Sequence, residues 1–352
     1  MIRFVTVLLG LLSTPTPTPT IPDLSTLPRA RATLDPAHHT LVIELVPVDL
    51  AAASSGMSML SLPTQQLIIP ASGSIYSVQT AVIDSAGNEL PRPFLHHVNL
   101  RDPKRRDLFL STGLHILAAS KETPTLDVPQ LVLGLPLERG QRLLATAMLN
   151  NPTDIPYHGV RIRLTFGYRL TEGFAGSVFP LFRAYPWVLD VKFPLGTGPE
   201  GSLAFDLPPG QTVQSWESSP AISGYVLGLG GHVHDFATEL ELTDATTGQV
   251  IWRQKPVRDS SGHVLEMPIT KFYRWYRLGL RIEASHRYRI TVRYDNPTGQ
   301  TLHGAGMGAV AGLFVPDRGK QWPMVDTTDA VYRQDLGEAF LPVDMKGMDM
   351  EH

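Results

Sequence analysis

The sequence predicts an all-β protein built from two tandem antiparallel jelly-roll (β-sandwich) domains. Thirty prolines and thirty glycines are scattered along the chain and interrupt almost every candidate helix. Short alternating or β-branched runs lie between them, at residues 40–46, 75–83, 160–168, 238–243 and 288–294. Strands of this length, separated by turn signals, are typical of sandwiches and jelly rolls. A parallel α/β sheet would need helices between its strands, and the sequence shows almost no helical pattern.

The chain divides into four predicted parts. Its 352 residues are enough for two domains that each bury a core of their own. A loop-like stretch rich in Gly, Pro and aromatic residues, at about 169–200, separates two strand-rich blocks. The predicted parts are a signal-like segment with a Thr/Pro linker (1–30), an N-terminal jelly roll (31–170), a C-terminal jelly roll (171–335) and a polar Met/His tail (336–352).

Composition excludes several classes of function. Hydrophobic residues make up 43% of the chain and charged residues 18%, which indicates a globular protein. The net charge is -3 and the one basic block is 104–106, so nucleic acid is not expected as a partner. The chain has no cysteine, which excludes disulfides and thiolate ligands. Any metal must therefore be held by His, Met, Asp or Glu.

The first twenty residues have the pattern of a secretory signal. Arg3 precedes an apolar run at 4–12, and Thr-Pro repeats continue to Thr20. The run is too short to span a bilayer, and no later stretch is long and apolar enough to do so. We therefore expect an exported protein, periplasmic or extracellular, with no membrane-spanning segment in the mature chain. The alternative interpretation of this segment is a frayed N-terminal strand.

Three clusters of metal-ligating residue types stand out among only 12 His and 10 Met. They are His96-His97, the pair His232 and His234, and Met307 in a glycine-rich segment. In a strand, His-x-His places both imidazoles on one face, whereas adjacent residues such as His96 and His97 face opposite ways. Two imidazoles with a thioether suit copper, because Cu(I) accepts sulfur and both oxidation states accept nitrogen. Zinc remains possible for the histidine pairs, but it gains little from a thioether.

The order of these clusters resembles that of the copper type II, ascorbate-dependent monooxygenases, as in peptidylglycine α-hydroxylating monooxygenase and dopamine β-monooxygenase. The likeness extends over about residues 55–315 and is that of a divergent bacterial-type member. Phe94-Leu-His-His-Val matches the family's His-His pair, and Gly231-His-Val-His-Asp matches its His-x-His. Met307 follows His234 by 73 residues, as the family's methionine ligand does. The resemblance implies two jelly-roll domains, each presenting one copper to a solvent-filled cleft.

The resemblance also implies a role for each cluster. His232, His234 and Met307 would be the catalytic ligands, holding the copper that binds and activates O2. His96 and His97 would hold a second copper that relays an electron. The family's third ligand there is a His just before an Asn-Pro turn, and in this chain Met148 stands in that position before Asn151-Pro152. His158 is a nearby alternative ligand.

The expected function is therefore hydroxylation of a C–H bond with O2 and ascorbate, or another one-electron donor, using two coppers per chain. This sequence departs from the family in three ways: it lacks the disulfides, it has Met148 where a His is expected, and residues 227–231 contain no substrate-binding arginine. These departures favour a rival hypothesis, a non-catalytic extracytoplasmic copper-binding or copper-handling protein. A third interpretation is a structural jelly-roll pair with no metal. The small-molecule substrate is not specified by the sequence.

Four further groups of residues were weighed as ligands or supports. His38-His39 is expected to be a surface or strand-edge pair. His303 could support Met307 from four residues away, and Asp235 could orient His234 or lie exposed to solvent. The tail has the soft-ligand composition of copper-scavenging segments, through Met345, Met348, Met350 and His352, although chance explains such a composition equally well.

Overall fold

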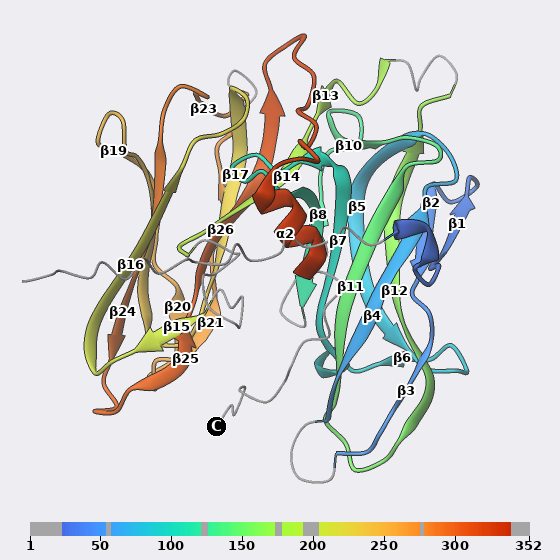
Figure 1. Ribbon diagram of the computed structural model, residues 1–352, viewed down its shortest axis with the longest axis horizontal. Helices are drawn as coiled ribbons and strands as arrows, with labels where there is room; N and C mark the ends of the chain where they lie inside the picture. Colours follow the sequence, from blue (N-terminus) through green and yellow to red (C-terminus); the bar gives the residue numbers. More distant parts are fainter. Residues whose placement is uncertain are drawn as a thin grey trace, which may run out of the picture.

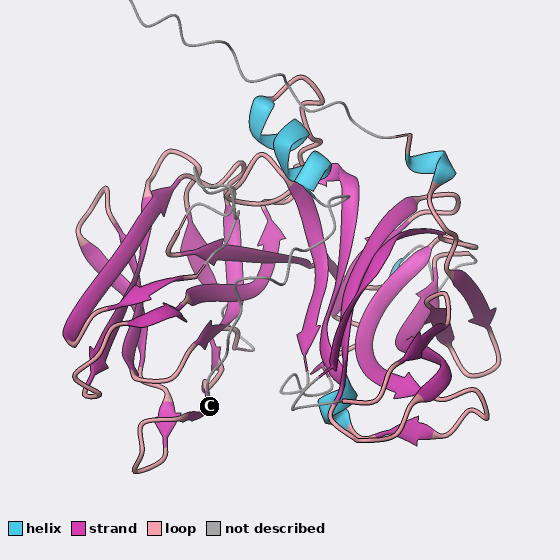
Figure 2. Cartoon of the chain, turned by 60° about the horizontal axis from the view of Figure 1, so that its bottom comes forward, coloured by secondary structure: helices cyan, strands magenta, loops and turns pink. Residues whose placement is uncertain are grey.

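The computed structural model describes residues 23–53, 58–120, 126–172, 178–192, 204–274 and 278–338. Within these residues the chain is almost entirely β-strand (Figures 1 and 2). The helical elements are the 3-10 turns η1 (Leu24–Thr26) and η2 (Arg92–Phe94) and the helix α2 (Ala330–Glu338). The predicted all-β class with two tandem sandwiches is confirmed.

The first sandwich contains strands β1 to β13. These are β1 (Arg31–Asp35), β2 (Thr40–Glu44), β3 (Val48–Leu50), β4 (Ser58–Ile68), β5 (Gly73–Ile83), β6 (Glu89–Leu90), β7 (Leu95–Arg106), β8 (Gly113–Ser120), β9 (Leu126–Asp127), β10 (Leu133–Leu137), β11 (Arg142–Asn151), β12 (Tyr157–Leu170) and β13 (Phe182–Arg183). One sheet has the order β1-β2-β12-β5-β10-β13, and the other has the order β4-β11-β7-β8. The pairing is antiparallel except between β10 and β13. The described part of the first sandwich is therefore a jelly roll.

The second sandwich contains strands β14 to β26. These are β14 (Tyr185–Asp190), β15 (Phe205–Leu207), β16 (Gly210–Ser218), β17 (Gly224–Val233), β18 (Ala237–Asp244), β19 (Gln249–Gln254), β20 (Val257–Arg258), β21 (Val264–Glu266), β22 (Thr270–Lys271), β23 (Leu280–Ile282), β24 (Tyr288–Asn296), β25 (Leu302–Gly306) and β26 (Gly308–Pro316). Its main sheets have the orders β14-β26-β17-β22 and β16-β24-β18-β19. These orders repeat β2-β12-β5-β10 and β4-β11-β7-β8 strand for strand.

The two sandwiches also share a turn built on an asparagine. The Asn151 amide donates to the carbonyls of Ala51 (2.7 Å) and Ile155 (2.8 Å), while its Oδ1 accepts from the Thr153 N–H at 3.0 Å. Asn296 makes the same set of contacts to the carbonyls of Leu207 and Gln300 and to the N–H of Thr298. A buried Asn thus ends the corresponding strand, β11 or β24, in each sandwich, by satisfying backbone groups that would otherwise be unpaired.

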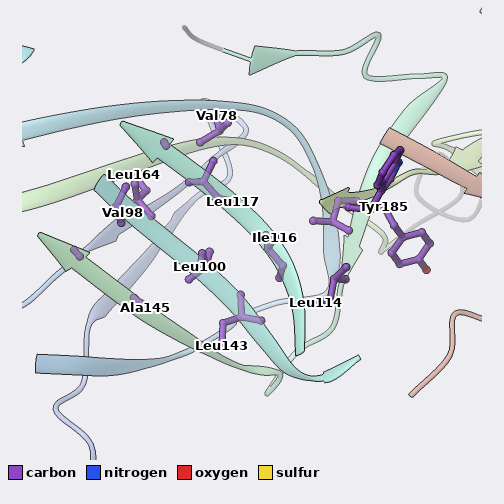
Figure 3. Close-up of a cluster of buried hydrophobic side chains, with 14 of the residues drawn as sticks. Val78, Val98, Leu100, Leu114, Ile116, Leu117, Leu143, Ala145, Leu164 and Tyr185 are labelled. Carbon is purple, nitrogen blue, oxygen red and sulfur yellow. The ribbon is translucent and has the colours of Figure 1, made fainter. Parts of the chain in front are cut away.

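The core of the first sandwich lies between its two sheets (Figure 3). Val78 and Leu164 come from one sheet, and Val98, Leu100 and Leu143 come from the facing sheet. All five side chains are buried, as alternation along each strand requires. This rigid layer fixes the strands β7 and β11, whose opposite face carries the first predicted metal cluster.

The segment between β7 and β8 joins the two sandwiches. The buried Phe109 packs its ring 5.0 Å from that of Trp187 and 6.1 Å from that of Tyr288, both in the second sandwich. The N–H of Ala221 donates to the carbonyl of Leu108 at 2.7 Å. A single hydrophobic cluster therefore runs through both sandwiches.

The helix α2 packs back on the first sandwich. Tyr332 and Leu336 form a buried cluster with Leu144 of β11, and Asp335 accepts from Arg101 of β7 at 2.7 Å. Similarly, β13 pairs with β10 although it follows the boundary predicted at residue 170. The predicted domain limits therefore stay a prediction.

The two ends of the chain need separate mention. The signal-like segment at 1–22 and the tail residues Met345, Met348, Met350 and His352 lie outside the described residues. Among the residues that are described, no helix has the length and apolar character needed to cross a membrane.

Candidate metal centre

The second predicted cluster is assembled where β17 and β26 pair. His232 lies opposite Ala309, and Val233 lies opposite Gly308. Met307 immediately precedes β26, so the strand register brings it beside His234, which immediately follows β17. The jelly-roll order explains how residues so distant in sequence meet, because β17 and β26 are neighbours in their sheet.

A buried tyrosine holds the two backbone segments together. The Tyr294 hydroxyl accepts hydrogen bonds from the N–H of His234 (3.1 Å) and the N–H of Met307 (3.0 Å). It also donates to the carbonyl of Met307. Burial raises the pKa of Tyr294, so the hydroxyl keeps its proton at any physiological pH. Tyr294 on β24 therefore fixes His234 and Met307 relative to each other.

The imidazoles of His232 and His234 lie close together, at a separation that two ligands of one ion can have. Their ring centroids are 5.1 Å apart and their planes are inclined at 86°. An imidazole nitrogen bound at about 2.0 Å puts its ring centroid roughly 3.2 Å from a metal, so two such rings lie about 5 Å apart. His234 Nδ1 is 3.1 Å from the carbonyl oxygen of Ala305, to which it donates a hydrogen bond. Metal-binding histidines commonly donate their second ring nitrogen to a backbone carbonyl in this way.

Close packing beneath the site depends on a glycine. A Cβ on Gly231 would lie 2.5 Å from Leu240 Cδ2 and 3.0 Å from the carbonyl oxygen of Ala309. The sheet containing His232 can therefore approach the core strand β18 only because residue 231 lacks a side chain.

The first predicted cluster lies on β7 and β11, where the ladder contains a β-bulge. His97 is opposite Met148, but the next pair is Leu95 with Leu149, so His96 is the extra residue. A bulge breaks the strict alternation of a strand. The expectation that His96 and His97 face opposite ways is therefore wrong. Their ring centroids are 5.2 Å apart, with planes inclined at 51°.

Met148 lies beside His97 on the outer face of this sheet. Directly opposed residues of an antiparallel pair share a face, and Met148 is only 2% exposed. Burial, with a smaller contribution from the charge of His96, lowers the pKa of His97 to about 4. His97 is therefore neutral at pH 7, which is the form that binds a metal.

Two other histidines considered from the sequence are exposed and lie beside carboxylates. His158 is exposed on β12, in the opposite sheet from Met148, with its Nδ1 3.3 Å from an Asp49 carboxylate oxygen. His303 is exposed and pairs its Nδ1 with Asp206 at 3.0 Å. The neighbouring carboxylate explains the position of each of these two imidazoles.

The remaining candidates have local structural contacts. The exposed His38 contacts Asp35 at 2.7 Å, as expected of a surface pair. Asp235 accepts from the N–H of Val264 at 2.8 Å and so anchors the hairpin β20–β21. Its carboxylate also lies 4.0 Å from His263 Nε2.

The nature of the donors limits which metals could bind. Nowhere in the described part of the chain do three or more His, Cys, Asp or Glu side chains gather as a metal site. At each cluster the third protein donor considered from the sequence is a methionine thioether, Met307 or Met148. Two imidazoles and a methionine sulfur fit copper, and they suit hard cations such as Mg²⁺ or Ca²⁺ poorly.

Sequence reasoning overlooked Tyr294 and the bulge at His96. Tyr294 could have been suspected, because Tyr294-Asp-Asn-Pro closes the strand that leads toward Met307. The bulge leaves no signal in a single strand, because it is defined by the pairing of β7 with β11.

Comparison with known proteins finds similar solved structures at low sequence identity. No protein-family model matches the chain, and no curated protein matches it. Among solved structures, the major capsid protein P2 of bacteriophage PM2 is 9% identical, with 80% of this chain and 100% of that chain covered and a TM-score of 0.34. A protein of the Sulfolobus Turreted Icosahedral Virus is 11% identical, with 76% and 58% covered and a TM-score of 0.20. A putative secreted protein from Eubacterium rectale is 7% identical, with 73% and 74% covered and a TM-score of 0.21.

Proposed function

We propose that this chain is a copper-binding, monooxygenase-like protein that uses O2 and a one-electron donor such as ascorbate to hydroxylate a C–H bond. The observation that carries the proposal is the strand register that sets Met307 beside His234, with the His232 imidazole 5.1 Å from that of His234. Tyr294 joins the backbone of His234 to that of Met307 through three hydrogen bonds. The donor set and the 5.1 Å separation of the two imidazoles both support copper.

In this proposal each residue around His234 has a defined task. Copper, when bound, supplies the redox chemistry with O2. The Nδ1–H of His234 donates to the carbonyl of Ala305, so Nε2 would be the nitrogen that binds copper. Met307 would contribute a soft donor that favours the reduced ion, and the Tyr294 hydroxyl keeps the backbone of Met307 in register with that of His234.

The cluster of His96, His97 and Met148 would hold the second copper, which stores and passes an electron. The low pKa of His97 keeps this ligand neutral, so metal binding there releases no proton from it near pH 7. The thioether of Met148 in place of an imidazole favours Cu(I), which raises the potential of this site.

A second candidate function is a non-catalytic copper-binding or copper-handling protein on the same fold. Met148 favours this alternative, because its 2% exposure and soft donor suit retention of Cu(I). Residues 227–231, which precede His232, are Leu-Gly-Leu-Gly-Gly and offer no charged group to a substrate. Both candidates share an extracytoplasmic location, a proposal supported by Arg3 and the apolar run that follows it.

Copper stoichiometry tests both functions. We would load purified protein with copper, remove the excess, and compare wild type with His232→Ala and His96→Ala. His158→Ala is the matched control, because His158 is an exposed histidine held by a carboxylate. Two coppers per chain, one lost in each test variant and none in the control, would support the relay and lead to an O2-consumption assay with ascorbate.

Other stoichiometries decide between the candidates. One copper, lost only with His232→Ala, would favour the binding or handling protein. Absence of bound copper in the wild type would refute both proposals and leave the structural jelly-roll pair.

A further inference from the structure

One face of the sheet β14-β26-β17 carries both the imidazole of His232 and the carboxyl group of Asp190. Asp190 lies opposite Ala309, and Ala309 lies opposite His232. Residues directly opposite each other in an antiparallel pair share a face of the sheet. Neighbouring strands are about 4.8 Å apart, so the two groups are separated by roughly 10 Å across the methyl group of Ala309.

This face points away from the core of the second sandwich. Leu189 and Val310, which alternate with Asp190 and Ala309 along their strands, are 0% exposed and belong to the core. His232 is exposed, whereas Ala309 and Asp190 are each 7% exposed. Solvent therefore reaches this row of three residues at His232, and Asp190 is its covered end.

Asp190 is a buried carboxyl group with no partner of its own. Three residues before it, Trp187 packs on Phe109 at the junction of the two sandwiches. Within the described chain, no group donates a hydrogen bond to the Asp190 carboxyl and no ion pair includes it. What acts on it is burial, and then the charges of Asp107 and Arg101. A buried polar group without a partner is unfavourable, and a ligand that supplies the partner would explain its place here.

The surface beside this row is small and apolar. In the next row, Val188 lies opposite Ala311, which lies opposite Gly230. A Cβ on Gly230 would lie 3.4 Å from Ile269 Cγ1, so Ile269 borders this row. Ile269 is 59% exposed, and Ala311 is exposed as well. An apolar chain lying on Ala311 and Gly230 would therefore cover apolar surface that now faces water.

We propose that this face binds the substrate of the metal centre, and that the substrate is a small uncharged molecule with an apolar body and one hydroxyl or N–H group. The hydroxyl or N–H group donates to the Asp190 carboxyl. The apolar body lies over Ala309 and Ala311 beside Ile269, and the end of the molecule at His232 is the end presented to the metal. Asp190 is thus a residue that determines specificity. This assignment of a substrate rests on the proposed function, whereas the binding step itself needs no metal.

The surroundings of Asp190 favour an uncharged partner. An ammonium group would have to lose its water shell to reach a carboxyl group that is only 7% exposed, at a cost that a hydroxyl group does not incur. Burial, and then the charge of Asp107, raises the pKa of Asp190 to about 7, so its neutral form predominates below that pH. A neutral carboxyl group both donates and accepts hydrogen bonds, as a hydroxyl or amide partner requires.

Three matched probes test the chemistry of the ligand. Pentanol, butyl methyl ether and pentylamine have equal numbers of non-hydrogen atoms, but only pentanol is an uncharged hydrogen-bond donor. We would titrate each probe into metal-free protein at about pH 6, where the amine is charged. The readout is the methyl signal of Ile269 by NMR, assigned with Ile269→Val. We expect pentanol to bind at least about fivefold more tightly than either of the other probes, which is the effect of one hydrogen bond.

Three variants and a control make the test specific. Asp190→Leu keeps the size of the side chain but removes the acceptor, so pentanol should bind no more tightly than the ether. Asp190→Asn keeps an acceptor and a donor, so the preference for pentanol should remain. Ala311→Phe places a ring on the exposed floor and should abolish the response to all three probes. Asp295→Leu is the control, because Asp295 is exposed on β24 in the opposite sheet and should behave like wild type.

Four outcomes would overturn the proposal. The first is wild-type protein that binds none of the probes. The second is equal binding of pentanol and the ether, which would mean that no donor is recognised. The third is tighter binding of pentylamine, which would assign the face to cations. The fourth is pentanol binding that is unchanged in both Asp190→Leu and Ala311→Phe.

Failure of the proposed function has a different signature. Protein that binds pentanol on this face but binds no copper would refute the metal centre and leave the ligand-binding face in place. Protein that binds two coppers but shows no preference for pentanol would refute this choice of substrate and leave the metal centre in place.

Discussion

Removing one oxygen atom from Tyr294 should weaken both the second sandwich and its metal cluster. The Tyr294→Phe change deletes the group that accepts from the N–H groups of His234 and Met307 and donates to the Met307 carbonyl. Each lost hydrogen bond costs about 1 kcal/mol. The three together should lower the free energy of unfolding by about 3 kcal/mol. In other metalloproteins, mutating a residue that orients a metal ligand typically lowers metal affinity or activity by roughly 10- to 100-fold. The Tyr294→Phe change should therefore lower copper affinity at least about tenfold.

The matched control is Tyr288→Phe on the same strand. Tyr288 and Tyr294 are each 2% exposed, but the Tyr288 hydroxyl accepts from only one backbone N–H, that of Glu283 at 2.8 Å. This control should cost about 1 kcal/mol and leave copper binding unchanged. Denaturant unfolding of the metal-free proteins gives the first quantity, and competition with a copper chelator gives the second.

Two results would refute this reasoning. If Tyr294→Phe were no more destabilising than Tyr288→Phe, the three hydrogen bonds would not hold the segment. If Tyr294→Phe lost stability but bound copper as tightly as wild type, Tyr294 would support the fold without positioning the ligands.

Two further predictions concern the first cluster and the junction. Met148→Leu keeps an apolar side chain of similar volume, so it should cost less than about 1.5 kcal/mol of stability while removing one copper per chain by metal analysis. Retention of two coppers would contradict a ligand role for Met148. Phe109→Ala removes the ring that packs on Trp187 and Tyr288 and leaves a cavity there. It should lower the free energy of unfolding by about 3–5 kcal/mol. It should also split thermal unfolding into two transitions in calorimetry, and a single unshifted transition would show that Phe109 does not couple the sandwiches.

The all-β class could be predicted because it depends on local signals. Proline and glycine positions and alternating runs are properties of short segments, so they are visible without knowledge of strand pairing. The repeated Asn-Pro-Thr at 151–153 and 296–298 was visible too, and its recognition would have indicated that the two sandwiches share one strand order. The structural role of this repeat could not be predicted from the sequence. The side-chain amides of Asn151 and Asn296 donate to the carbonyls of Ala51 and Leu207, which are far away in the sequence.

The sites were predicted less completely because they depend on pairing between distant strands. The order of His234 and Met307 suggested a joint site, but the hydroxyl of Tyr294 that links them could be placed only by the strand register. The bulge at His96 belongs to the ladder between β7 and β11 and cannot be inferred from either strand alone. The packing of Phe109 on Trp187 and Tyr288 is a contact between sandwiches, for which the sequence has no local signal.

The two clusters are not copies of one ancestral site, although the sandwiches share one strand order. The first cluster is on the sheet β4-β11-β7-β8, whereas the second is on β14-β26-β17, which corresponds to the other sheet of the first sandwich. If a duplicated sandwich had carried its site along, His97 and His232 would occupy corresponding strands. The two clusters therefore lie on sheets that do not correspond to each other in the shared strand order.

Strand register shows which residues share a face with each cluster. Arg101 shares a face of β7 with His97, because they are four positions apart and alternation has period two. Asp190 lies opposite Ala309, which lies opposite His232, so these three share a face of the second sheet. Strand register thus defines two faces, one with His97 and Arg101 on β7 and one with His232, Ala309 and Asp190 in the second sandwich. Helix α2 packs on the first of these faces, through Leu144 and Arg101.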